Sequence, residues 1–317
     1  MNIPCPKCGF ESPESATECS RCGIVFGKWI PEAAHVGRAS ARLNGLKPVP
    51  QDDGTADGRL GATEIRVLGI GLALAIIAHA IPFTTFIFHP INTLVHELGH
   101  AIAGWLLGYP SVPSFDFMYG GGITPHGAHQ IAIALVVAGG FAYLGYIFRD
   151  NRRTVALISA CFLVWLFIEA SEWRRLLVVS AAGHVSECVF AGIFLYMAIA
   201  GVGWRMPEVE RPLGAFVAFF LEITMIRFCL DLMRNEDFLE SYKQGKGGML
   251  MHDIDSISAD LTIHTAWHPG IQALARLLLL FSFVPMAVAL LLYFRRSQAQ
   301  RVITSFYAPQ TDGPGGR

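Results

Sequence analysis

Seven long runs of apolar residues limit what this chain can fold into. A helix needs roughly 20 apolar residues to cross the ~30 Å hydrocarbon core of a bilayer, and most of the runs are long enough. Since only helices and closed barrels satisfy the backbone in lipid, the continuous runs predict transmembrane helices. Charged residues make up only 15% of the chain, against about 25% in soluble domains, which excludes two ordinary soluble domains. The runs comprise 151 of the 317 residues and lie at residues 65–88, 91–108, 131–148, 154–170, 176–204, 213–233 and 271–294.

We therefore predict an all-α polytopic membrane protein with about seven transmembrane helices, within a range of six to eight. The count has a range because Pro82 stands inside the first run and could break it. The cysteine-rich residues 1–30 are expected to form a separate head, and residues 31–64, rich in Gly, Pro, Ala and Asp, a flexible linker. Residues 65–294 form the predicted transmembrane domain, and residues 295–317 a polar C-terminal tail.

The head contains two CxxC pairs, Cys5 with Cys8 and Cys19 with Cys22, separated by ten residues. Each pair can place two thiolates on one side of a tight turn, and four thiolates complete a tetrahedral zinc shell. Two disulfides in a secreted domain are the alternative, but the CxxC spacing favours zinc and no cleavable signal peptide is expected at the N-terminus. The head resembles a short bacterial zinc ribbon. Because four cysteine ligands leave no open position, we expect a structural zinc and docking of a cytosolic protein partner.

The second apolar run contains His96, Glu97 and His100 in the pattern HExxH. On a helix the two histidines share one face and can bind one zinc ion, while Glu97 can take a proton from metal-bound water. Ionisable side chains inside an apolar span cost several kcal/mol, so they need a reason to be there. The structural alternative is that the three side chains only make hydrogen bonds to neighbouring helices. The pattern favours a catalytic zinc site.

The segment 96–101, HELGHA, followed by small residues in an apolar helix, resembles the site-2 protease family of intramembrane zinc metalloproteases. The resemblance implies hydrolysis of peptide bonds in transmembrane substrates, with His96 and His100 as zinc ligands and Glu97 as the general base. The Gly-rich residues 120–124 also resemble the membrane-associated segment that often follows this helix in the family.

The third zinc ligand does not follow from the resemblance. The family supplies an Asp from an Asn-Pro…Leu-Asp-Gly motif on a later span, and this motif is missing from the sequence. Asp231 is the nearest match, but Leu232 replaces the glycine. Asp231 also lies roughly 3 Å inside one membrane face, whereas the HExxH motif lies roughly 13 Å from the other face if seven spans cross. These depths argue against Asp231.

His184 and Glu187 in the fifth run are better candidates for the third ligand. They are three residues apart, share one helical face, and lie about nine residues inside a long span, at a depth compatible with the HExxH motif. One of them could bind zinc while the other forms a hydrogen bond to a zinc ligand and fixes its orientation. Alternatively, both could only form contacts between helices. Asp253 and Asp255, in the polar segment before the last run, are weaker alternatives.

Two functions from different classes follow. The first is an intramembrane zinc metallopeptidase that cleaves membrane protein or peptide substrates, with one catalytic and one structural zinc. The second is a non-catalytic membrane zinc-binding scaffold or sensor that acts through its ribbon, a role that would not need Glu97. The near balance of 24 basic and 25 acidic residues gives no reason to expect nucleic-acid binding. A zinc head with four cysteine ligands favours the reducing cytosol, so we expect the bacterial inner (cytoplasmic) membrane with a cytosolic N-terminus.

Overall fold

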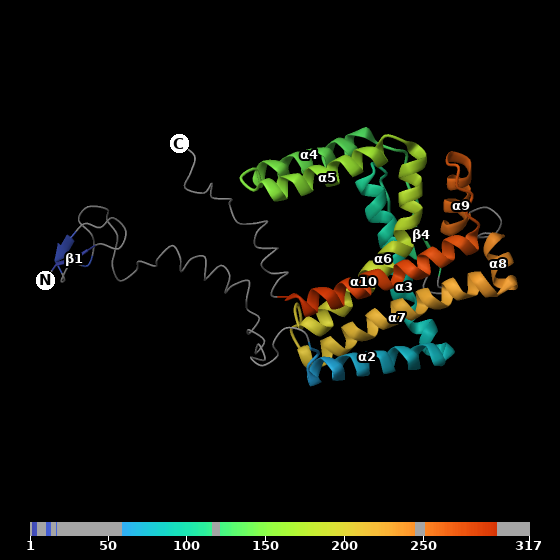
Figure 1. Ribbon diagram of the computed structural model, residues 1–317, viewed down its shortest axis with the longest axis horizontal. Helices are drawn as coiled ribbons and strands as arrows, with labels where there is room; N and C mark the ends of the chain where they lie inside the picture. The colour runs from blue at the N-terminus through green and yellow to red at the C-terminus, as the bar shows by residue number, and fades with distance from the viewer. Residues whose placement is uncertain are drawn as a thin grey trace. The chain divides into compact units, whose positions relative to one another are not determined.

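The computed structural model divides the chain into two compact units, Met1–Gly54 and Thr55–Arg317. The residues that the structure describes are 2–4, 11–13, Thr17, 59–115, 121–244 and 251–296. In the second unit the elements are, in chain order, α2 (Ala62–Ala80), α3 (Pro82–Leu106), β3 (Ser114–Phe115), β4 (Gly122–Ile123), α4 (Ile131–Ile147), α5 (Arg152–Glu169), α6 (Glu172–Ala200), α7 (Pro207–Arg234), α8 (Glu236–Lys243), α9 (Asp253–His264) and α10 (Ile271–Phe294) (Figure 1).

In the first unit, strand β1 (Asn2–Pro4) pairs antiparallel with β2 (Glu11–Pro13), and Ile3 lies opposite Ser12. The four cysteines of the predicted zinc ribbon lie outside the described residues, as do most of the predicted linker and the tail from residue 297 onward. The zinc ribbon and the domain boundaries at residues 30 and 64 therefore stay predictions.

Among the described residues, four helices are long and apolar enough to cross a membrane, namely α2, α6, α7 and α10. The second unit is thus an all-α membrane protein. The runs at 91–108, 131–148 and 154–170 also form helices, but each misses one requirement of a span. Helix α3 is made polar by its HExxH residues, α4 has 17 residues and so extends only about 25 Å, and α5 carries two arginines and a glutamate.

The first apolar run, 65–88, is broken where Pro82 predicted a break. Helix α2 ends at Ala80, Ile81 is extended, and α3 begins with Pro82 in its first turn, where a missing backbone N–H costs nothing. The hydroxyl groups of Thr84 and Thr85 donate hydrogen bonds to the carbonyl oxygen of Ala78, at 2.9 and 2.7 Å. These bonds satisfy a C-terminal carbonyl of α2 that its own helix leaves free.

Helix α6 is the centre of the bundle and contacts α2, α3, α5, α7, α9 and α10. At two of its close approaches to neighbouring helices, one helix has a glycine at the contact. A Cβ on Gly99 of α3 would collide with the carbonyl oxygen of Ala182 and the hydroxyl of Ser186, and a Cβ on Gly192 would lie 2.7 Å from the carbonyl oxygen of Pro285 in α10. Small residues allow helix backbones to approach closely, which favours association inside lipid.

The four candidate spans alternate in direction. Helix α2 runs parallel to α7, because Gly71 faces Ala215 and His79 hydrogen-bonds to Thr224 further along both helices. Helices α6 and α7 are antiparallel, since Arg211 donates to the carbonyl oxygen of Ala198 while His184 stacks on Phe228. Helix α10 is also antiparallel to α7, with Ala289 packed near Ala218 and Ala275 near Leu232. The start of α2 and the end of α10 therefore share one side of the bundle.

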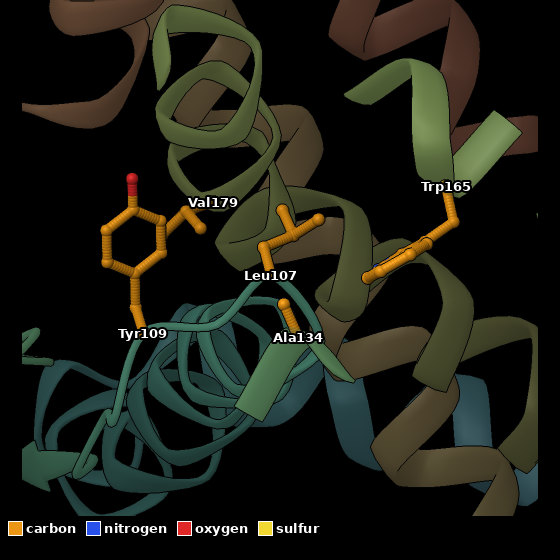
Figure 2. Packing of buried hydrophobic residues seen from close by; sticks show 5 residues of the cluster. All are labelled: Leu107, Tyr109, Ala134, Trp165 and Val179. Atoms are coloured by element: carbon orange, nitrogen blue, oxygen red, sulfur yellow. The ribbon is translucent and has the colours of Figure 1, made fainter. Parts of the chain in front are cut away.

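A cluster of buried apolar side chains fastens the α4–α5 pair to the rest of the bundle (Figure 2). The indole N–H of Trp165 in α5 also donates a hydrogen bond of 2.8 Å to the carbonyl oxygen of Leu106, at the end of α3. The cluster thereby fixes the C-terminal end of α3 against the first half of α6, where the candidate site lies. Its members are Leu107, Tyr109, Ala134, Trp165 and Val179.

The alternation of the four candidate spans predicts that the start of α2 and the end of α10 lie on one side of the membrane and α8 on the other. Reporter domains whose activity depends on the side should give the same signal when fused ahead of Ala62 and after Arg296, and the opposite signal after Lys243. Matching signals from the Arg296 and Lys243 fusions would show that the number of crossings between α8 and the tail is even, against the single crossing by α10 that the structure contains.

Candidate metal centre

Helix α3 carries His96 and His100 one turn apart and presents both imidazoles to α6 at Gly183. A Cβ on Gly183 would collide with Nε2 of His100 and would lie 2.6 Å from Nε2 of His96. The missing side chain thus leaves the space in which the two rings meet. Ser186, one turn further along α6, donates a 2.8 Å hydrogen bond to the carbonyl oxygen of Val95 and holds the two helices together beside the site.

Three potential ligand atoms converge in this space. Nε2 of His96 lies 3.0 Å from Nε2 of His100, and Oδ2 of Asp253 lies 2.9 Å from the first and 3.2 Å from the second. His100 is buried and His96 is mostly buried, while the side chain of Asp253 is 29% exposed. Asp253, a weaker alternative in the sequence, is therefore the carboxylate that the fold brings to the histidines.

Helix α9 delivers Asp253 from outside the candidate spans. It runs antiparallel to α6, because Asp253 in its first turn lies near Gly183 while His264 at its end stacks on Trp173, at the start of α6. Helix α8 folds back along the end of α7, where Tyr242 packs against Phe228 at a ring distance of 5.8 Å. A polar segment between two spans thus turns back toward the bundle interior.

The start of α9 is held in place by Tyr242 of α8. The backbone N–H of Ile254 donates a 3.2 Å hydrogen bond to the Tyr242 hydroxyl, and the ring of His252 stacks on the tyrosine at 4.3 Å. Burial raises the pKa of the Tyr242 phenol, which stays neutral. Burial also works to raise the pKa of Asp253, but hydrogen bonds from His100 and His96, when their Nε2 atoms carry an added proton, outweigh this and hold the pKa of the carboxyl well below its usual range. Asp253 is therefore an ionised carboxylate at the centre of the cluster.

The groups behind the two rings determine which nitrogens face the cluster. Nδ1 of His100 lies 2.7 Å from the carbonyl oxygen of Val179, and Nδ1 of His96 lies 2.8 Å from Oε1 of Glu187. Because these oxygens only accept, Nδ1 carries the hydrogen in both rings, and a neutral imidazole then has its lone pair on Nε2. Two lone pairs and the Asp253 carboxylate converge, so the arrangement needs a positive charge between them, either an added proton or a metal ion.

The donor set and its spacing fit zinc. Catalytic zinc takes three protein ligands of the His and carboxylate type and keeps one open position. With metal–ligand distances of about 2.0–2.1 Å, tetrahedral ligand atoms are about 3.3 Å apart. The separations of 2.9, 3.0 and 3.2 Å in the cluster fall within a few tenths of an ångström of that value. His96, His100 and Asp253 could therefore hold zinc without rearrangement.

Glu187, expected to be a candidate ligand, lies behind His96 and not among the converging atoms. Its carboxylate accepts from Nδ1 of His96 at 2.8 Å and from the Asn92 amide at 3.1 Å, and its second oxygen lies 3.5 Å from Nδ1 of His184. This is the orienting position that a carboxylate takes behind a metal-ligating histidine. The three-residue spacing of His184 and Glu187 correctly placed both on one face, but spacing does not tell which side of His96 the carboxylate occupies.

His184 lies at the edge of the cluster. One of its ring nitrogens is within 4.8 Å of ligand atoms on both His96 and Asp253. Two overlapping sets of three residues thus share His96 and Asp253; the atoms of the set with His100 lie 2.9–3.2 Å apart, and those of the set with His184 lie within 4.8 Å of one another. We take His96, His100 and Asp253 as the principal ligands because only their atoms already have the spacing of a metal shell.

Glu97, which follows His96 in α3, is buried and is held by the short β3–β4 hairpin. Its Oε2 accepts a 2.6 Å hydrogen bond from the hydroxyl of Thr124, and Gly122 in β4 lies so close that a Cβ there would collide with Oε1 of Glu97. Gly122 and Thr124 of the Gly-rich segment that follows α3 therefore pack on the proposed general base. Thr124 and Gly183 were not singled out from the sequence, because their roles depend on contacts between segments that no local spacing reveals.

The remaining candidates lie apart from the converging ligand atoms. Asp231 is exposed near the end of α7, as its depth in the sequence suggested, and Asp255 lies two residues beyond Asp253 in the first turn of α9. One sequence feature could have favoured Asp253, namely that acidic residues stand in the first turn of a helix in the polar segment before the last apolar run. The position of Asp253 inside the bundle could not be inferred from the sequence. Counting residues from the nearest predicted span end assumes that the polar segment stays outside the bundle.

Comparison of the chain with models of protein families, with curated proteins and with solved structures gave no match. Any functional conclusion therefore depends on the residues of the cluster themselves.

The close contact at Gly183 predicts that Gly183→Ala disrupts the metal centre. The added methyl group would displace both imidazoles, so zinc affinity should fall by about tenfold or more, the scale seen when groups that position a ligand are lost. Zinc retained by the full-length protein in detergent, titrated against a chelator, measures this. Gly139→Ala in α4 is the matched control, because a Cβ there meets nothing within 4 Å. Equal affinities for the two variants would contradict the packing argument.

The position of Asp253 predicts a difference between two neighbouring carboxylates. Asp253→Asn removes a charged candidate ligand and should release zinc bound at the cluster, whereas Asp255→Asn, in the same turn of α9, should leave the zinc content unchanged. Metal content after dialysis, compared with the thermal stability of each variant, separates ligand loss from unfolding. Loss of zinc on Asp255→Asn alone would show that Asp255, and not Asp253, is the ligand.

Proposed function

We propose that this protein is an intramembrane zinc metallopeptidase of the site-2 protease type, which hydrolyses peptide bonds of membrane-embedded protein substrates. The observation that carries the proposal is the convergence of His96, His100 and Asp253 beside Glu97, in a helix packed within a membrane bundle. Two imidazoles, a carboxylate and an adjacent glutamate are the parts that zinc peptidases of the HExxH type require.

In the proposed function, one group of residues holds the metal and another residue transfers the proton. His96, His100 and Asp253 would hold the zinc, while Glu187 and the carbonyl of Val179 fix the orientation of the two imidazoles. Zinc, when bound, supplies a Lewis acid that polarises the substrate carbonyl and makes water nucleophilic near neutral pH. The carboxylate behind His96 also makes that imidazole a stronger ligand.

Glu97 would act as the general base. It takes a proton from the attacking water and passes it to the amine that leaves as the peptide bond breaks. The hydrogen bond from Thr124 fixes one oxygen of the carboxylate at 2.6 Å, which keeps the side chain in one orientation. A base that is already oriented avoids the loss of conformational freedom at the moment of reaction.

The remaining features fit the same function. We propose that Cys5, Cys8, Cys19 and Cys22 bind a second, structural zinc, and that this ribbon docks a cytosolic protein partner. We also propose the bacterial inner membrane as the location, with the N-terminus in the cytosol. Both termini would then be cytosolic, and the three arginines that follow α10 would obey the positive-inside tendency. They are Arg295, Arg296 and Arg301.

Cleavage of single-span substrates tests the peptidase proposal. Full-length protein in detergent with zinc should cleave at least one member of a panel of single-span proteins, and Glu97→Gln should lower the rate by about 10²–10⁴, the usual contribution of general base catalysis. Glu97→Gln should keep its zinc, because Glu97 is not among the ligands. Product analysis by mass spectrometry measures the rate and the cleavage site.

Glu172→Gln, an exposed position in the first turn of α6, is the matched control and should cleave like the wild type. Equal rates for Glu97→Gln and the wild type, or no cleavage by either with zinc bound, would contradict the peptidase. The non-catalytic zinc scaffold would then be the better account.

A further inference from the structure

His184 lies next to the cluster and has no role in the peptidase proposal. Its ring contacts His96 edge to face at a centroid distance of 4.6 Å, and it stacks on Phe228 of α7 at 4.9 Å. The side chain is only 12% exposed. A polar ring buried between two helices of a membrane bundle needs a partner, since an unsatisfied polar group costs free energy there.

The carboxylate of Glu187 faces Nδ1 of both His96 and His184. Oε1 faces Nδ1 of His96 at 2.8 Å, and Oε2 faces Nδ1 of His184 at 3.5 Å. Because the same group attracts Nδ1 of both rings, their Nε2 atoms are left to point away from it. For His96 that direction is the metal cluster, and a ring nitrogen of His184 already lies within 4.8 Å of ligand atoms on His96 and Asp253.

We infer that His184 is a fourth, displaceable zinc ligand that closes the metal centre at rest. This inference rests on the zinc site of the proposed function and adds a means of regulation to it. With His96, His100, His184 and Asp253 all bound, the zinc has four protein ligands and no open position, as in structural sites. A substrate peptide bond and a water molecule can enter only when the bond between His184 and zinc breaks and water takes the vacant position.

The geometry shows why His184, and not another ligand, is the one that leaves. Its nitrogen lies up to 4.8 Å from its neighbours, against 2.9–3.2 Å among the other three ligand atoms. Its bond to Glu187, at 3.5 Å, is at the limit of a hydrogen bond, against 2.8 Å for His96. Phe228 offers the displaced ring a surface on which it already stacks.

A closed metal centre would prevent unselective cleavage of the transmembrane segments that always surround the protein in the membrane. An open catalytic zinc would meet every neighbouring transmembrane segment, whereas a site closed by His184 reacts only with a substrate whose binding energy offsets the loss of one ligand. The class of substrate selected is therefore a segment that binds strongly at positions away from the zinc before it reaches the metal.

Counting the imidazole ligands by zinc X-ray absorption tests the inference without relying on activity. The full-length chain with Cys5→Ser and Cys8→Ser would be used, so that the head contributes no zinc. We expect three imidazoles bound to zinc in this protein and two after His184→Ala is added. His79→Ala is the matched control, because His79 is a membrane histidine bonded to Thr224 and not part of the cluster, and it should leave three.

The outcomes of this experiment distinguish failure of the His184 inference from failure of the peptidase proposal. Two imidazoles before any change at His184 would overturn the inference and leave the peptidase proposal intact. No intramembrane zinc at all would overturn both. In the cleavage assay, His184→Ala should raise the rate at saturating zinc, since the centre is then open and three ligands remain. A fall of about tenfold or more with zinc still bound would overturn the inference and give His184 a part in proton transfer instead.

Discussion

The close contact between α3 and α6 is the interaction on which the metal centre depends. Gly99 and Gly183 lie on the two facing helices at the same crossing, and neither position has room for a Cβ. The hydrogen bond from Ser186 to the carbonyl oxygen of Val95 holds this crossing as well. In lipid, helices gain little from burying apolar surface against each other, so such close packing and interhelical hydrogen bonds determine where they meet. If either glycine carried a side chain, the two imidazoles could not share one space with α6.

The same contact explains how a bilayer tolerates several ionisable side chains in one place. The carboxylate of Glu187 has donors on both oxygens, from Asn92, His96 and His184, and the carboxylate of Glu97 accepts from Thr124. Each charge is thus paired within the bundle instead of facing lipid, which lowers the cost of placing it there. Pairing alone does not account for the cluster, however, because three acceptors converge at its centre and leave a place for a cation.

Features that depend on local spacing were predictable from the sequence, and features that depend on distant contacts were not. A helical period places His96 and His100 on one face, and the fixed φ of Pro82 breaks the first run at the end of α2. Asp253 is 157 residues from His96, and its place in the cluster arises because α8 and α9 turn back toward the bundle. The prediction of about seven spans counted every apolar run as a span, whereas four helices among the described residues are long and apolar enough to cross a membrane.

The two predicted zinc sites differ in what must fold before each can bind its ion. The four cysteines of the head lie within residues 5–22, so a short segment and its zinc can form one unit. The intramembrane site takes two ligands from α3 and one from α9, and it needs α6 to orient them and α8 to hold the start of α9. Zinc bound there would therefore stabilise the docked α8–α9 segment by linkage. We therefore expect that displacing the α8–α9 segment would also release a metal bound at the proposed site, because Asp253 would leave the two histidines of α3.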